Sequence, residues 1–121
     1  MDRRTLGKNG EEYAVSFLSQ AGLKIVARNY RCYKGEMDII AWDQSTLVFV
    51  EVRTKSSAVM GWGEESITEK KRRRLRSIAA SYLLEKGYKE WPAMRIDLVA
   101  LRWENKCGGP GLTLGAWIKG I

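Results

Sequence analysis

The chain has no histidine among its 121 residues. Histidine is the side chain whose charge changes near neutral pH, and it is a common general base and metal ligand. Its absence excludes Ser-His-Asp triads, nucleases and phosphotransferases with a histidine base, and zinc sites with histidine ligands. Any catalysis would therefore depend on carboxylates, lysine, tyrosine or a hydroxyl group, together with a bound metal ion.

Cysteines and long apolar runs are also scarce. The only two cysteines, Cys32 and Cys107, lie far apart and show no metal-ligand spacing, so we expect a reduced, cytoplasmic protein. No apolar run approaches the roughly 20 residues that span a bilayer, so no membrane partner is expected. The first residues, "MDRRTLGKNGEEYA", lack the apolar segment of a secretory signal.

Positive charge is abundant. The 21 Lys+Arg outnumber the 14 Asp+Glu, which gives a formal net charge of +7. This excess favours a polyanionic partner, most often nucleic acid, although a basic surface alone would also explain it. A chain of 121 residues that is 45% hydrophobic can bury the core of a single domain, which we place at residues 1–121.

Hydrophobic periodicity predicts an α/β fold with a mixed β-sheet flanked by helices, in the order α-β-β-β-α-β. The helix that starts near residue 66 has two candidate N-terminal caps, a capping box from Ser66 to Glu69 or Thr68 alone. Residues 112–121 are predicted to form an edge strand or a tail. The predicted elements are a helix at 7–21, strands at 23–30, 30–42 (bent near Gly35) and 47–54, a loop at 55–66, a helix at 66–86 and a strand at 94–103.

Two carboxylates, Asp38 and Glu51, are set inside apolar strand-like runs, where an unpaired charge is costly. Strand alternation puts Asp38 on one face with Glu36 and Ile40. It likewise puts Glu51 on one face with Phe49, Arg53 and Lys55. If the two strands pair as a hairpin, Asp38 and Glu51 converge, and a divalent cation such as Mg²⁺ would relieve their repulsion.

Structural alternatives remain open for each acid at this stage. Glu51 could form a salt bridge with Arg53 or with a cation on a neighbouring strand, and Asp38 could accept a backbone hydrogen bond at a strand edge. Glu11 lies at the border of the apolar stripe of the first helix and could face the two carboxylates. It could equally offset the helix dipole, whereas Glu12 lies on the solvent face.

The second helix carries a dense basic run, "EKKRRRLR", at residues 69–76. Consecutive cations repel one another, and phosphates of a nucleic acid would relieve that repulsion. We predict that Lys70, Arg73 and Arg74 contact phosphates, although a solvated face would look similar. Trp62, in the preceding loop, is expected to be a hydrophobic plug rather than a platform for base stacking.

Several of these segments together resemble the YraN-like family of small bacterial proteins. They are "GxxGExxA" from Gly7, "ARNYRCYKGEMDII" from Ala27, "LVFVEVRTK" from Leu47, "ITEKKRRRLRSIAASYL" from Ile67 and "RIDLVAL" from Arg95. The resemblance covers about residues 5–103, which would form the core, with 104–121 as a C-terminal strand or tail. The YraN-like family is placed by similarity in the PD-(D/E)XK nuclease superfamily, near the archaeal Holliday-junction resolvases.

This resemblance implies a restriction-endonuclease-like core and a Mg²⁺ or Mn²⁺ site. It matches Glu11, Asp38 and Glu51 to the metal-binding acids, with Arg53 at the position of the motif lysine. The expected function is metal-dependent hydrolysis of DNA, with branched DNA among the candidate substrates, and Asp38, Glu51, Arg53 and Lys55 as catalytic residues. The alternatives are a non-catalytic nucleic-acid-binding module and a basic protein that binds an acidic protein, with a homodimer left open.

Overall fold

A computed structural model describes residues 3–56, 67–106 and 108–121 of the chain. In these residues the element order is α-β-β-β-α-β-β. The elements are α1 (Arg3–Gln20), β1 (Lys24–Cys32), β2 (Gly35–Asp43), β3 (Thr46–Ser56), α2 (Glu69–Glu85), β4 (Ala93–Lys106) and β5 (Gly109–Ile118).

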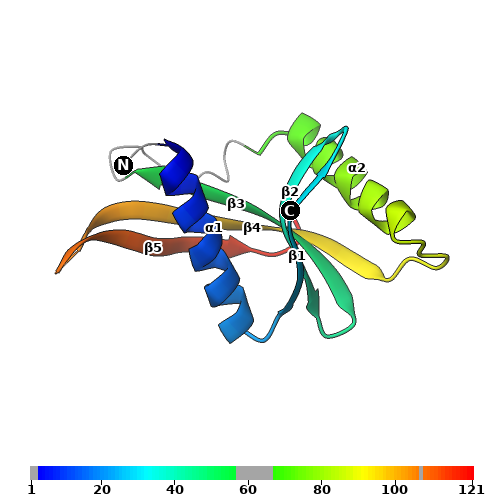
Figure 1. Cartoon of the computed structure of the whole chain (residues 1–121), viewed down its shortest axis with the longest axis horizontal. Coiled ribbons are helices and arrows are strands. Elements are labelled where there is room, and N and C mark those ends of the chain that lie inside the picture. Colours follow the sequence, from blue (N-terminus) through cyan, green and yellow to red (C-terminus); the bar gives the residue numbers. More distant parts are fainter. Residues whose placement is uncertain (1–2, 57–66, 107) are drawn as a thin grey trace.

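The strands form one five-stranded sheet in the order β1-β2-β3-β4-β5. The β3–β4 pair is parallel and the other three pairs are antiparallel. The parallel pair needs a crossover, and α2 lies in that connection, as Figure 1 shows. The predicted α/β fold with a mixed sheet is therefore confirmed, and the C-terminal segment is a strand rather than a tail.

The sheet has an apolar core on each face, because its central strands are buried on both sides. On β3, Leu47 and Phe49 pack with α2, whereas Val48 and Val50 pack with α1. All four side chains have no exposed surface. Strands that are covered on both faces are apolar throughout, which explains the continuous run "LVFV". The helices thus form outer layers on opposite faces of the sheet (Figure 1).

The prediction of one strand over residues 30–42 is wrong, because the chain turns there. β1 ends at Cys32, which pairs with Gly35, and Tyr33 and Lys34 form the turn of a β-hairpin. Gly35 has a φ of 141°, and a Cβ at this position would lie 3.1 Å from the Cδ1 of Ile78 on α2. Glycine therefore permits both the turn and the close packing of the hairpin tip against α2.

The start of α2 settles the choice between the two predicted caps. Thr68 is extended, with φ −81° and ψ 166°, and its Oγ1 accepts a hydrogen bond from the N–H of Lys71 at 3.1 Å. Thr68 is thus the N-cap, and the helix begins at Glu69. The predicted loop lies mostly at residues 57–66, including Trp62, outside the residues that the structure describes.

Neither helix in the described part of the chain combines the length and the apolar character needed to cross a membrane.

Candidate functional site

Strands β2 and β3 separate at Asp38 and Glu51. The ladder between them runs from Asp43↔Thr46 to Ile39↔Val50 and stops one position before these two acids. Beyond that point β3 continues to pair only with β4. Val52, two positions past the last β2–β3 pair, donates its N–H to Oδ2 of Asp38 at 2.8 Å. The carboxyl group of Asp38 therefore lies at the point where the two strands diverge.

The carboxyl groups of Asp38 and Glu51 contact each other at this point. Burial raises the pKa of Asp38 from its ordinary value of 3.8 to about 8, and repulsion by Glu51 adds to the rise. The Val52 N–H lowers the pKa of Asp38, but not enough to offset these two effects. Asp38 therefore binds a proton more readily than an ordinary aspartate does, and a hydrogen bond between the two carboxyl groups adds to this preference.

Glu51 is 7% exposed and lies near two cations. Its Oε2 is 3.1 Å from Nζ of Lys71 on α2 and 3.6 Å from Nε of Arg53 on β3. Both structural alternatives raised by the sequence are thus present, the ion pair of Glu51 and the backbone hydrogen bond of Asp38. Neither one explains why a second carboxyl group is buried against Glu51.

Asp97 on β4 shows what a buried structural carboxylate looks like in this protein. It has no exposed surface, and its oxygens accept hydrogen bonds from Arg95 Nε at 3.0 and 3.2 Å. Trp117 Nε1 and the Gly120 N–H also donate to it, each at 3.0 Å. Asp97 therefore has a cation and two further donors, as a buried charge requires. Asp38 instead faces another acid, which is typical of a functional site.

Helix α1 approaches β3 closely and so brings Glu11 to the site. A Cβ at Gly10 would collide with Oγ1 of Thr54, and this hydroxyl has no hydrogen-bond partner within the part of the chain that the structure describes. Only glycine at this position lets the helix pack so tightly on the strand. The next residue, Glu11, is near enough to Asp38 for its charge to raise the pKa of Asp38 further.

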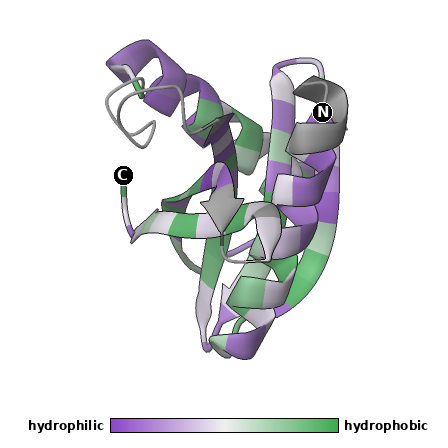
Figure 2. Ribbon diagram, turned by 90° about the vertical axis from the view of Figure 1, so that its left-hand side faces the viewer, coloured by the Kyte–Doolittle hydropathy of each residue, from purple (hydrophilic) through white to green (hydrophobic). Residues whose placement is uncertain are grey.

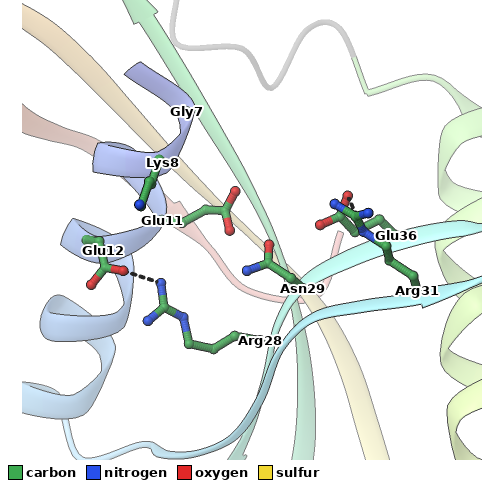
Figure 3. A pocket seen from close by; sticks show the side chains of 8 residues that line it. All are labelled: Gly7, Lys8, Glu11, Glu12, Arg28, Asn29, Arg31 and Glu36. Carbon is green, nitrogen blue, oxygen red and sulfur yellow. Dashed lines mark hydrogen bonds and ion pairs between the residues drawn. The ribbon is translucent and has the colours of Figure 1, made fainter. Parts of the chain in front are cut away.

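Glu11 belongs to a polar cluster with Asn29 and Glu36 of the β1–β2 hairpin. Figure 3 shows Glu11 and Asn29 pointing toward each other, and both line a cavity of about 650 Å³. With its amide nitrogen turned to the acids, Asn29 donates to Glu11 at 2.6 Å and to Glu36 at 3.0 Å. Burial raises the pKa of Glu11, and repulsion by Glu36 raises it further.

Asn29 reaches these acids because its backbone is left-handed, with a φ of 53°. Asparagine tolerates this conformation better than most residues do. In the β1–β2 register, Arg28 pairs with Ile39 and Tyr30 with Met37, so Asn29 falls opposite Asp38. The side chain of Asp38 is therefore flanked by β1 on one side and by Glu51 of β3 on the other.

The oxygen donors fit a cation that keeps part of its water shell. Within the described residues, no three His, Cys, Asp or Glu side chains are close enough together to ligate one ion. Asp38 and Glu51 thus form a two-carboxylate set, and Glu11 is a neighbouring charge rather than a third ligand in this structure. Mg²⁺ is often held by one or two carboxylates plus water and substrate phosphates, so the donor set suits it.

The prediction that Glu36 shares a face of β2 with Ile40 is wrong. Met37 packs in the core under α2 and Ile39 in the core under α1, although they are two residues apart. The alternation is lost where β2 leaves β3, and Glu36 lies beside Glu11 instead of sharing a face with Ile40. The expected exposure of Glu12 is confirmed, and its Oε1 accepts a hydrogen bond from Arg28 at 2.7 Å.

The predicted phosphate-binding residues lie on the surface of α2. Lys70, Arg73 and Arg74 are exposed, and none of the three forms an ion pair with a residue that the structure describes. Figure 2 shows the hydrophilic character of much of α2. Lys71, which lies in the same basic run, is directed to Glu51 instead and is a site residue that the sequence did not reveal. Lys55 is half-buried at the far end of β3.

The fold and the site define a class: an α/β protein with a mixed sheet and a buried carboxylate pair where two strands diverge. The sequence model of the uncharacterised protein family UPF0102 matches residues 10–101. The chain belongs to this family, and the resemblance to the YraN-like proteins is thereby confirmed.

Bacterial relatives match over most of their length. A UPF0102 protein of Desulfitobacterium hafniense is 53% identical over 98% of this chain and 97% of its own. A UPF0102 protein of Nocardia farcinica is 44% identical over 83% of this chain and 78% of its own. A UPF0102 protein of Mycobacterium tuberculosis is 43% identical over 93% of this chain and 91% of its own. Their names give no activity.

A solved structure, that of Pyrococcus furiosus SfsA in complex with Ca²⁺, aligns with 97% of this chain and 64% of its own. The sequence identity is 14% and the TM-score is 0.42. A likeness at this level supports no statement about the site or function of the chain.

Proposed function

We propose that the chain is a metal-dependent endonuclease that hydrolyses phosphodiester bonds in DNA. The observation that carries the proposal is the contact between the buried carboxyl groups of Asp38 and Glu51. Ionising both carboxyl groups is costly without a bound metal ion, and the pair lies where two strands separate, beside a basic helix. The resemblance to PD-(D/E)XK nucleases matches the same two acids to the metal-binding positions of that superfamily.

Asp38 and Glu51 would hold Mg²⁺ or Mn²⁺, with Glu11 adding negative charge from α1. When bound, such an ion supplies charge that polarises the scissile phosphate and lowers the pKa of an attacking water. Ion binding would require Asp38 to release its proton, because the protonated carboxyl group is a poor ligand. The N–H of Val52 would then hold the Asp38 carboxylate in place through its 2.8 Å hydrogen bond.

Lys71 is the residue that we assign to the role of the missing motif lysine. Arg53 occupies the motif position, but arginine stays protonated in proteins and cannot accept a proton from water. Lys71 reaches Glu51 from α2, and its Nζ is 0.5 Å nearer to Oε2 than Nε of Arg53 is, at 3.1 against 3.6 Å. Lys71 would stabilise the negative charge that develops on the phosphoryl oxygens or take the proton of the attacking water.

This assignment replaces a sequence-based expectation for Lys55. Strand alternation put Lys55 on one face of β3 with Glu51 and Arg53, and Lys55 was therefore expected to be a catalytic residue. The described contacts of Glu51 include Lys71 and Arg53 and not Lys55. Lys55 would instead bind a phosphate at the end of β3.

DNA is the proposed substrate because the carboxylate pair lies beside a helix with exposed basic side chains that could bind phosphates. Lys70, Arg73 and Arg74 project from the same helix that carries Lys71, so a phosphate backbone along α2 would pass close to Glu51. Contacts of this kind position the duplex without distinguishing its sequence.

The second candidate function is a nucleic-acid-binding module without catalysis. The observation that favours it is Arg53 at the lysine position, because this change removes a proton acceptor while it keeps the charge. In that case Lys71 and Arg53 would serve only to neutralise Glu51, and the basic helix would still bind DNA.

Single-turnover cleavage of labelled DNA duplexes and junctions in Mg²⁺ or Mn²⁺ tests the proposal. We expect the natural protein to cut, Glu51→Gln to be inactive, and Lys71→Ala to cut about 100-fold more slowly, the size expected of a proton-transfer or charge-stabilising group. Lys71→Arg separates the two roles: a rate near that of the natural protein assigns Lys71 to charge stabilisation, and a rate near that of Lys71→Ala assigns it to proton transfer.

Lys89→Ala is the matched control, because Lys89 is exposed and lies beyond the C-terminus of α2. It should cut at the rate of the natural protein. If no DNA is cut in either metal while DNA binding persists, the endonuclease proposal is wrong and the binding module remains. If Lys71→Ala cuts as fast as Lys89→Ala, the assignment of Lys71 is wrong.

A further inference from the structure

Tyr33, at the tip of the β1–β2 hairpin, is the most exposed of the large hydrophobic side chains that the structure describes. Its exposed fraction is 90%, compared with 68% for Leu84 and 47% for Trp91. Single exposed apolar residues are common and need no explanation by themselves. Three features distinguish Tyr33 from an ordinary surface residue. The hairpin tip that carries it packs against α2, cations surround its ring, and it lies close to the carboxylate pair.

The hairpin tip is held firmly although its aromatic ring is not. The neighbouring Cys32 pairs with Gly35 across the turn and packs against the core cluster under α2. Gly35 approaches the side chains of Ile78 and Arg74 on α2 so closely that a Cβ would be 3.1 Å from the first and 3.7 Å from the second. The ring of Tyr33 therefore projects into solvent from a two-residue turn that is fixed against a helix.

The surroundings of Tyr33 are mostly cationic. Nζ of Lys34 lies 5.5 Å from the ring centroid, within the range of a cation–π contact. Arg31, on the adjoining strand, is 77% exposed at its side chain, and its only described acid partner, Glu36, is 3.7 Å away. Arg74 is exposed on the helix that supports the tip. An aromatic face among cations suits a nucleobase with its phosphates, because the base stacks while the cations contact the backbone.

The tip also lies close to the carboxylate pair. Gly35 is three residues before Asp38 on the same strand, which corresponds to about 10 Å along β2. Successive bases along one strand of a duplex are about 3.4 Å apart, so Tyr33 would reach a base only a few nucleotides from the phosphate at the site. Bases inside a duplex are already stacked on their neighbours, and only an unpaired base offers a free face to the ring.

We propose that Tyr33 is a stacking platform for an unpaired base, so that the candidate nuclease site prefers DNA in which a duplex adjoins unpaired nucleotides. The inference rests on the proposed function, since it names the substrate class of the same site. Tyr33 would be a specificity residue and would take no part in the chemistry.

Binding in EDTA tests this preference separately from cleavage. The probes are a forked DNA with 2-aminopurine at the first unpaired position and a fully paired duplex of the same length. Stacking on an aromatic ring strengthens binding by about 5- to 150-fold per base, so we expect the natural protein to prefer the fork by a factor in that range. Contact of the ring with 2-aminopurine should also quench its fluorescence.

Tyr33→Ala should lose both the preference and the quenching while its affinity for the duplex stays unchanged. Tyr33→Phe keeps the ring and should retain both. Trp91→Ala is the matched control, because Trp91 is also exposed but precedes β4, away from the hairpin tip. The inference is overturned if Tyr33→Ala still prefers the fork, if Trp91→Ala loses the preference equally, or if the natural protein binds both DNAs alike.

The two proposals fail in different ways. A protein that quenches the forked probe through Tyr33 but cuts no DNA in Mg²⁺ or Mn²⁺ supports the stacking inference and contradicts the endonuclease. A protein that cuts fork and duplex at equal rates, with Tyr33→Ala unchanged, supports the endonuclease and contradicts the stacking inference.

Discussion

At the scale of single residues, the unusual feature is the raised pKa of Asp38, whose buried carboxyl group favours its protonated form. Its pKa in the folded protein is about 8, against an ordinary value of 3.8, chiefly because of burial and then because of Glu51. The folded state therefore binds this proton more tightly than the unfolded state does. The stabilisation from this proton is complete below about pH 4 and is lost as the pH rises toward 8.

Asp38→Asn should raise the free energy of unfolding at pH 8 by about 1–2 kcal/mol, because the amide cannot ionise. The asparagine oxygen can still accept the Val52 N–H, and its nitrogen can donate to Glu51. At pH 4 the substitution should have little effect. Urea denaturation in EDTA at the two pH values measures both quantities.

Glu90→Gln serves as the control for Asp38→Asn, because Glu90 is an exposed acid whose substitution should leave stability almost unchanged at both pH values. If Asp38→Asn destabilises the protein at pH 8 as much as at pH 4, the two carboxyl groups do not repel each other as described.

The same scale shows which site residues could be predicted from sequence. The closeness of Asp38 and Glu51 could be predicted because acids in apolar strands are costly, and the β2–β3 register, extended by one position, places the two opposite each other. Lys71 could not be singled out from its basic neighbours, because its contact with Glu51 depends on how α2 lies over the sheet. Asn29 was not predicted because its direction depends on a left-handed backbone in β1, and Glu36 was assigned to the wrong face because β2 departs from β3 there.

At the scale of elements, α1 is positioned by the close contact between Gly10 and Thr54. Gly10→Ala would place a Cβ against Oγ1 of Thr54 and force the helix away from β3. Alanine favours a helix by up to about 1 kcal/mol over glycine, but crowding in a packed core costs about 1–3 kcal/mol. We therefore predict a net loss of stability in Gly10→Ala, measured by chemical denaturation.

A double-mutant cycle tests whether contact with Thr54 causes the loss of stability in Gly10→Ala. Thr54→Ala removes the hydroxyl that the new methyl group would meet, so Gly10→Ala should cost much less in that background. Equal costs in both backgrounds would show that the helix is not held close by this contact.

The turn at Tyr33 and Lys34 shows why one element was mispredicted. The segment "YRCYKGEMDII" has no Asn-Gly or Asp-Gly signal of a two-residue turn. The turn depends on Gly35 and on packing against Ile78, which is a tertiary contact. By contrast, both helices were predicted from their helical periodicity, although α1 begins four residues earlier than expected, and β3 was predicted from its continuous apolar run.

The basic run of α2 should make DNA binding depend on salt concentration. Replacing Lys70, Arg73 and Arg74 together by alanine should weaken DNA binding similarly for all sequences. The slope of log affinity against log salt should become less steep by about 2–3 units, because each phosphate contact releases a counterion. The pair Lys86→Ala and Lys89→Ala, at the other end of the helix, is the control. An unchanged slope in the triple variant would show that this face of α2 is only solvated.

At the scale of the whole molecule, metal binding, proton release and stability are linked. Mn²⁺ at 100 times its dissociation constant should stabilise the folded protein by about 2.7 kcal/mol at pH 8. The affinity should fall as the pH drops below the Asp38 pKa of about 8, since the ion must displace the proton. Thermal unfolding with and without Mn²⁺ at pH 8 and pH 6 measures this linkage. Equal stabilisation at both pH values, or stabilisation that persists in Glu51→Gln, would contradict it.

The central claim is that Asp38 and Glu51 together bind a divalent cation. Anomalous diffraction from crystals soaked in Mn²⁺ at pH 8 tests it most directly. The account predicts an anomalous peak within bonding distance of both carboxyl groups, and no peak there in crystals of Asp38→Asn soaked in the same way. A map of the natural protein with no peak between these two side chains, or an undiminished peak in Asp38→Asn, would contradict it.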